Sequence, residues 1–75
     1  MNTQEKLAVL EDIMELDEGT LKPETRLDDV EEWDSLAALS FVVLLGDEFN
    51  RKISGKDIRA FERVQDMLDV MEPEG

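Results

Sequence analysis

One short segment of this sequence combines a reactive side chain with a setting that could use it: Asp34-Ser35-Leu36, at the start of an apolar run. Asp34 is a favourable helix N-cap, because its carboxylate can accept hydrogen bonds from first-turn N–H groups. Ser35 then occupies the first helical position, where its hydroxyl is not needed for capping and can face solvent. A phosphate ester there would meet free N–H groups and the positive end of the helix dipole. Asp-Ser before an apolar helix is also a routine start signal, so the dipeptide alone favours a structural role.

Other reactive side chains are scarce, because the 75 residues include no cysteine, histidine or tyrosine. A disulfide framework and a thiolate metal site are therefore excluded. Histidine, the commonest general base and the commonest metal ligand, is therefore not available either. Serine nucleophiles usually depend on a histidine or lysine partner, and the sequence indicates no such pair. We therefore predict a protein that is not an enzyme and whose reactive chemistry is borrowed.

The charge is strongly acidic, with 20 Asp and Glu against 8 Lys and Arg and a net charge of −12. Such a charge repels nucleic-acid phosphates and anionic membranes. It suits encounters with basic patches on partner proteins, and it could equally serve solubility alone. The acidic N-terminal sequence is expected to be neither a signal nor a transit peptide, and no segment is long enough to span a bilayer. We expect a cytoplasmic monomer that binds neither nucleic acid nor membrane.

The elements that must position Ser35 are helices, because helical periodicity dominates the sequence. We predict an all-α, single-domain four-helix bundle with a long first connection. In this connection the apolar residues follow neither the period of a strand nor that of a helix, and each can anchor the loop onto the helices; they are Leu21, Leu27, Val30 and Trp33. The predicted elements are a helix at about 3–16, a loop at 17–33, and helices at about 35–49, 55–61 and 62–71.

Capping signals support these boundaries. Asn2 and Glu5 have the spacing of a capping box at the start of the first helix. Ser54 and Asp57 provide a similar cap for the short third helix. Pro73 is expected to stop the last helix, and the final residues are expected to fray.

The predicted helix at 35–49 is apolar on both sides. The expected core stripe has the i, i+3, i+4, i+7, i+11 spacing and consists of Ala38, Phe41, Val42, Leu45 and Phe49. The opposite side carries Leu36, Ala37, Ser40, Val43, Leu44 and Asp47. In so small a protein only one side can face most of the core, so the outer side is a candidate interface.

The whole arrangement resembles the acyl carrier protein family. The resemblance rests on the run from Pro23 to Val30, on Asp34-Ser35-Leu36, and on the apolar helix that ends Asp47-Glu48-Phe49, and it extends to Val64-Gln65. It implies that a phosphopantetheinyl transferase, using coenzyme A and magnesium, attaches 4′-phosphopantetheine to Ser35. Asp34 and Leu36 match the neighbours that the transferase reads. The arm would carry acyl groups as thioesters to partner enzymes of fatty acid, polyketide or related specialised biosynthesis. It would also raise the effective concentration of the acyl group near the active site of the docked partner.

The sequence departs from the family on the exposed side of this helix. Members that serve bulk fatty acid synthesis carry several acids there, whereas only Asp47 and Glu48 supply charge here, near the far end. We therefore expect a more apolar partner surface and a specialised set of acyl-loading and acyl-using enzymes with basic docking surfaces. The residues assigned to partner recognition are Leu36, Ala37, Ser40, Val43, Leu44, Asp47 and Glu48.

Trp33 is a second departure, because a small residue often precedes the Asp-Ser pair. The indole could cover the base of the arm or select partners, but we favour the interpretation that it anchors the long loop by its apolar area. No specific metal site is expected, since no EF-hand loop is visible. Weak divalent binding at Asp28, Asp29, Glu31 and Asp34 is possible, and we predict that calcium, magnesium or salt raises the melting temperature by screening repulsion.

Two alternatives remain open at this point. An aminoacyl, peptidyl or aryl carrier of a nonribosomal or other specialised pathway would keep the chemistry and change the cargo. A small acidic helical adaptor or ion-binding module would use Ser35 only to start a helix. The identity and length of the cargo lie beyond the sequence.

Overall fold

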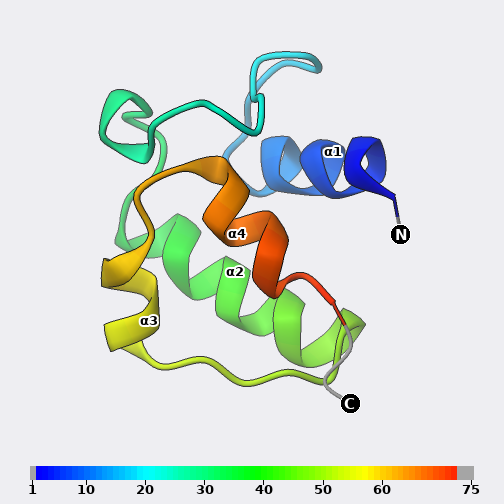
Figure 1. Ribbon diagram of the computed structural model, residues 1–75, viewed down its shortest axis with the longest axis vertical. Helices are drawn as coiled ribbons and strands as arrows, with labels where there is room; N and C mark the ends of the chain where they lie inside the picture. The colour runs from blue at the N-terminus through cyan, green and yellow to red at the C-terminus, as the bar shows by residue number, and fades with distance from the viewer. Residues whose placement is uncertain (1, 73–75) are drawn as a thin grey trace.

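The computed structural model describes residues 2–72 and places four α-helices in this span (Figure 1). They are α1 (Thr3–Ile13), α2 (Ser35–Glu48), α3 (Gly55–Ala60) and α4 (Val64–Val70), with a short 3₁₀ helix, η1 (Leu27–Asp29), in the first connection. The described residues form no strand beyond a single antiparallel bridge between Arg26 and Arg63. α1 packs against both α2 and α4, and in Figure 1 α3 lies near the start of α2. The predicted all-α fold of four helices is therefore confirmed.

Several helix ends differ from the predicted ones. α1 ends at Ile13, earlier than the predicted residue 16, and Glu15 adopts a left-handed backbone conformation with φ of 57°. α2 ends at Glu48, and Asn50 adopts the left-handed conformation (φ 50°) that commonly follows a helix. α3 and α4 are also shorter than predicted, and η1 interrupts the segment predicted to be an irregular loop. The predicted stop at Pro73 and the fraying after it lie outside the described residues.

The predicted caps of α1 and α3 are confirmed. Asn2 Oδ1 accepts from Glu5 N at 2.8 Å, and Glu5 Oε1 accepts from Asn2 N at 3.1 Å. Ser54 Oγ accepts from Asp57 N at 3.4 Å, while Asp57 Oδ2 accepts from Ser54 N at 3.0 Å. Each pair satisfies backbone donors that a helix start leaves without intrahelical partners.

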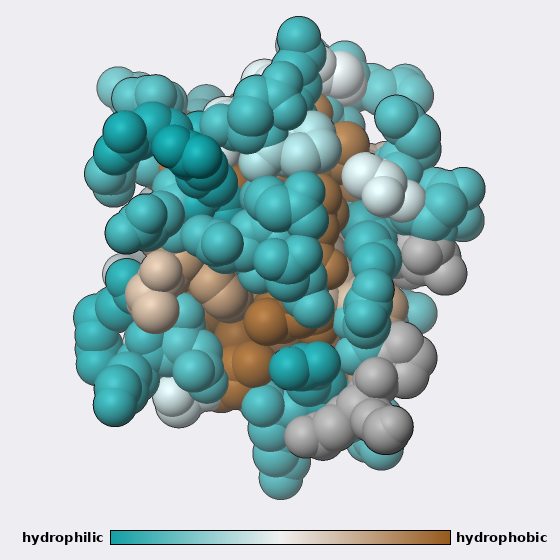
Figure 2. Space-filling model, viewed as in Figure 1, coloured by the Kyte–Doolittle hydropathy of each residue, from teal (hydrophilic) through white to brown (hydrophobic). Residues whose placement is uncertain are grey.

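The core takes side chains from α1, α2, α4 and the long connection. The largest fully buried side chains are Phe41, Leu10, Leu45, Met67, Met71 and Val64. On the face seen in Figure 2, apolar side chains form a band that hydrophilic residues flank. No helix among residues 2–72 is long and apolar enough to cross a membrane.

The two sides of α2 divide differently from the prediction. Ala37 was placed on the outer side, but it is only 5% exposed and belongs to the core with Phe41 and Leu45. Ala38, predicted to lie in the core stripe, is only partly buried. Leu44, also predicted to be outward, is partly buried and packs against the core. The cause is that α2 is apolar on both sides, so its own periodicity cannot select the buried stripe.

The long connection between α1 and α2 is held at several points, which places the start of α2. Leu21 and Leu27 are buried in the core. Backbone hydrogen bonds join Leu27 N to Glu62 O (3.0 Å) and Val64 N to Thr25 O (2.9 Å). This segment therefore packs against the start of α4, and its predicted anchoring by apolar residues is confirmed.

Candidate functional site

Ser35 is the first residue of α2, and Asp34 is its N-cap, as predicted. Asp34 Oδ1 accepts a hydrogen bond from Ala37 N at 2.9 Å, which satisfies one donor of the first turn. Ser35 is exposed, and its hydroxyl has no hydrogen-bond partner within residues 2–72. The hydroxyl is therefore free for an external reagent.

The backbone around Ser35 favours a negative charge. The N–H groups of Ser35 and Leu36 have no partner in the described part of the chain, since Asp34 occupies only the N–H of Ala37. The 14-residue α2 adds the positive end of its dipole at the same point. A phosphodiester on the Ser35 oxygen would lie beside these donors.

A surface cavity of about 380 Å³ opens beside Ser35. It lies between the start of α2, the preceding loop and the end of α3, and is lined by Leu27, Asp28, Trp33, Asp34, Ser35, Ala38, Ile58, Arg59 and Phe61. Ser35 therefore lines a surface cavity whose other residues are partly apolar and partly charged.

Trp33 anchors the loop as favoured from the sequence. It is partly buried, and its ring meets the fully buried Phe41 edge-on, with centroids 6.1 Å apart and planes at 79°. Phe41 meets Phe61 in the same manner, at 5.9 Å and 78°. Sequence reasoning missed this aromatic layer, because Phe61 comes from a distant part of the chain.

The outward side of α2 exposes three large apolar side chains on successive turns. Leu36 is 72% exposed, Leu39 61% and Val43 55%. Leu39 was missed from the sequence, although the i, i+3, i+7 spacing from Leu36 could have indicated it. Asp47 and Glu48 are exposed near the far end of α2, as predicted, whereas Ser40 is partly buried. The buried Ala37 cannot contribute surface to a partner.

The acidic residues near the site do not converge. Asp28, Asp29, Glu31 and Asp34 are all exposed. Among residues 2–72, no group of three or more acidic side chains lies close enough together to hold a metal ion. These four residues therefore form no shared cation site in the structure.

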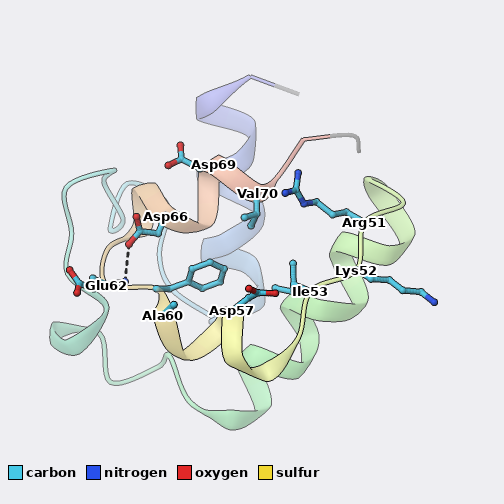
Figure 3. Close-up of a pocket in the computed structure, with 10 residues that line it drawn as sticks. Arg51, Lys52, Ile53, Asp57, Ala60, Glu62, Asp66, Asp69 and Val70 are labelled. Atoms are coloured by element: carbon cyan, nitrogen blue, oxygen red, sulfur yellow. Dashed lines mark hydrogen bonds between the residues drawn. The ribbon is translucent and has the colours of Figure 1, made fainter. Parts of the chain in front are cut away.

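A second, larger cavity of about 510 Å³ lies between α3, α4 and the segment after α2, and does not include Ser35 (Figure 3). Its charged residues include Asp66, whose Oδ2 accepts hydrogen bonds from Glu62 N (2.8 Å) and Arg63 N (3.1 Å). The first of these bonds is drawn in Figure 3. They hold the pKa of Asp66 below its ordinary value, the bond from Glu62 contributing most. Asp66 thus caps the start of α4.

Comparison with protein families gave a match that spans most of the chain. Residues 7–71 match the family model described as "Phosphopantetheine attachment site". The chain belongs to this family of carrier proteins. Comparisons with curated proteins and with solved structures gave no match. The carrier domain attaches a 4′-phosphopantetheine prosthetic group, and an exposed serine at a helix N-terminus with unused N–H groups is chemically suited to that group.

Proposed function

We propose that this carrier is an acyl carrier protein and that Ser35 Oγ is its attachment point. The observation that carries the assignment is the state of the Ser35 hydroxyl, which is exposed and makes no hydrogen bond within residues 2–72. The other two serines are less suitable: Ser40 is partly buried within α2, and the Ser54 hydroxyl caps α3.

The attachment step is a phosphoryl-group transfer. A new bond forms between Ser35 Oγ and the phosphorus next to pantetheine in coenzyme A, and the bond from that phosphorus to the nucleotide phosphate breaks. The hydroxyl proton passes to a base of the phosphopantetheinyl transferase, since the carrier has no histidine or cysteine. The carrier contributes a helix start held by Asp34 and the two free N–H groups that would face the phosphodiester.

Intact mass spectrometry tests the proposal. The apo protein is incubated with coenzyme A, magnesium and a broad-specificity transferase. We expect a mass gain of one phosphopantetheine, its loss in Ser35→Ala and its retention in the control Ser40→Ala. A mass gain that persists in Ser35→Ala would place the attachment elsewhere.

The outward side of α2 supports a docking role for partner enzymes. Exposed Leu36, Leu39 and Val43 offer apolar area, and Asp47 and Glu48 offer negative charge at its far end. A partner with a basic rim and an apolar centre fits this surface. We propose a specialised client set, because little charge accompanies the apolar face. A bulk-pathway ketosynthase that accepts this carrier as readily as its own would contradict that proposal.

An aminoacyl or peptidyl carrier is the second candidate. Both classes use the same attachment chemistry, and the net charge of −12 favours the acyl class only mildly. Loading assays separate them: an acyl carrier is charged by acyl-transferring enzymes, whereas an aminoacyl carrier is charged by an amino-acid-activating enzyme. In either case we propose that catalysis belongs to the partner enzymes.

A further inference from the structure

Two surface cavities lie together where α1 meets the long connection, and neither includes Ser35. Their volumes are about 340 and 160 Å³, and they share three lining residues, Ala8, Glu11 and Glu18. The larger cavity adds Leu16, and the smaller one adds Leu21. We call the two cavities together the α1 hollow. It combines apolar walls with carboxylates, on a part of the surface that the proposed attachment does not use.

Glu11 is the buried polar side chain of the α1 hollow, with only 4% of its surface exposed. Its Oε2 accepts the N–H of Leu21 at 2.9 Å, and no donor of residues 2–72 pairs with its other oxygen, Oε1. Every fully buried side-chain oxygen in the described residues has a hydrogen-bond partner. Oε1 therefore retains access to the hollow, where it is an acceptor without a donor.

The charge of the α1 hollow is negative and is not balanced from within. Asp12 and Glu18 add exposed carboxylates to its lining, and no lysine or arginine lines either cavity. The two ion pairs found among residues 2–72 involve neither of these acids nor Glu11. The three carboxylates are too far apart to converge on one metal ion in the described structure. The hollow therefore suits a cation that carries apolar surface.

We propose that the α1 hollow binds a primary ammonium group on an aliphatic chain, and that its occupant is a lysine side chain of a partner protein. The ammonium would donate to Glu11 Oε1 beside Glu18, and its methylene groups would pack against Ala8 and Leu16. An arginine fits less well, because a guanidinium pairs best with both oxygens of a carboxylate and Leu21 N–H already occupies one of them. The net charge of −12 would attract a basic partner surface. This contact is separate from the outward side of α2 and does not rest on the attachment to Ser35.

An NMR titration of the isotope-labelled full chain tests the proposal with Nα-acetyl-lysine amide, which presents a lysine side chain and no other charge. We expect saturable shifts of the Leu21 amide and Leu16 methyl resonances, with a dissociation constant on the order of millimolar for so small a probe. The methyl resonances of Leu39, on the outward side of α2, should stay in place.

Three further probes define the chemistry of the occupant. The Nε-acetylated lysine probe lacks the charge, and tetramethylammonium keeps the charge but has no N–H donor, so neither should saturate the Leu21 and Leu16 signals. Equal shifts with tetramethylammonium would show only general attraction of cations and would overturn the proposal, as would a lysine probe that shifts neither signal. A free diamine, 1,4-diaminobutane, tests the other source of the same group. If it binds more than about tenfold tighter than the lysine probe, the assignment to a partner protein fails.

Glu11→Gln separates the ammonium contact from the structural role of Glu11. The glutamine oxygen can still accept the Leu21 N–H, but its NH₂ group replaces Oε1 and cannot accept a hydrogen bond. We expect the lysine probe to bind at least about tenfold more weakly, since a charge-assisted hydrogen bond is roughly twice as strong as a neutral one. Glu24→Gln removes one charge from an exposed acid outside the hollow, and this matched control should change the affinity by less than about twofold. Equal affinities of Glu11→Gln and the wild type would overturn the assignment.

A second variant keeps the test decisive if Glu11→Gln does not fold. Ala8→Met changes an exposed residue of α1 and fills the α1 hollow from its wall, while Glu11 keeps its bond to Leu21. We expect this variant to fold and to lose the saturable shifts of the Leu21 amide. Unchanged binding of the lysine probe to a folded Ala8→Met protein would place the ammonium elsewhere and refute the proposed site.

Discussion

Glu11 Oε2 accepts a hydrogen bond from the backbone N–H of Leu21 at 2.9 Å, and this bond is buried. Glu11 is only 4% exposed although its side chain is a carboxyl group, and it lies one helical turn after the core residue Leu7 on α1. A buried N–H needs a partner, and the turn that brings Leu21 into the core leaves its N–H facing α1. Glu11 therefore joins α1 to the long connection that ends at Ser35.

Removing the Glu11 carboxylate should destabilise the fold. Glu11→Ala leaves the Leu21 N–H buried without a partner, which costs about 1–3 kcal/mol of unfolding free energy. Urea denaturation followed by circular dichroism measures it. Asp12→Ala, one residue along on the exposed side, is the control and should change stability by less than about 0.5 kcal/mol. Equal effects of the two substitutions would contradict the role of this bond.

The Asp34 cap should stabilise α2 independently of the prosthetic group. Asp34→Ala removes the acceptor of the Ala37 N–H and should cost about 0.5–2 kcal/mol in the apo protein. Asp34→Asn keeps a side-chain oxygen at the cap and should retain most of the stability. Chemical denaturation of the three proteins in parallel checks the order. An apo Asp34→Ala protein as stable as the wild type would show that the cap is dispensable.

The Phe41 ring should be among the most important side chains for stability. It is fully buried and meets both Trp33 and Phe61, so Phe41→Ala should cost about 3–5 kcal/mol, a large share of the about 5–15 kcal/mol typical of a domain. Thermal unfolding of this variant beside Leu39→Ala provides the comparison. The exposed Leu39 change should stay within about 0.5 kcal/mol. Similar melting curves for both variants would contradict the predicted contribution of Phe41 to stability.

Asp66 should make the free energy of unfolding depend on pH. Hydrogen bonds from the N–H groups of Glu62 and Arg63 lower its pKa in the folded protein. A lowered folded pKa contributes stability above the unfolded value, about 3.9 for an aspartate, and the contribution is lost as pH falls through the folded pKa. The stability difference between the wild type and Asp66→Asn should therefore shrink as pH falls below about 4. A difference that is constant from neutral to strongly acidic pH would refute this.

Salt should stabilise the carrier by general screening. With a net charge of −12 and mostly exposed acids, raising sodium chloride to about 0.1 M shortens the screening length to about 10 Å and should raise the melting temperature. Among residues 2–72, no three acidic side chains lie close enough together to hold a metal ion. Magnesium and calcium at matched ionic strength should then act much as sodium does. A large additional rise with magnesium would reveal a specific site.

Local sequence features determined the position of Ser35. The Asp34 cap, the first helical position of Ser35 and the reciprocal caps of α1 and α3 all depend on residues within one helical turn, so the sequence predicts them correctly. The periodicity likewise predicts the four helices, although their ends differ where Glu15 and Asn50 turn the backbone left-handed. The family resemblance rested on the same local motifs.

The tertiary structure alone decided which groups surround Ser35. α2 is apolar all round, so only packing against the rest of the bundle selects Ala37 for the core and leaves Leu39 exposed. The burial of Glu11 depends on the backbone N–H of Leu21, ten residues further along the chain. The cavity wall beside Ser35 depends on Trp33 and Phe61, which are far apart in the sequence. These relations come from long-range packing, because periodicity describes one helix at a time and cannot specify what the other elements place against it.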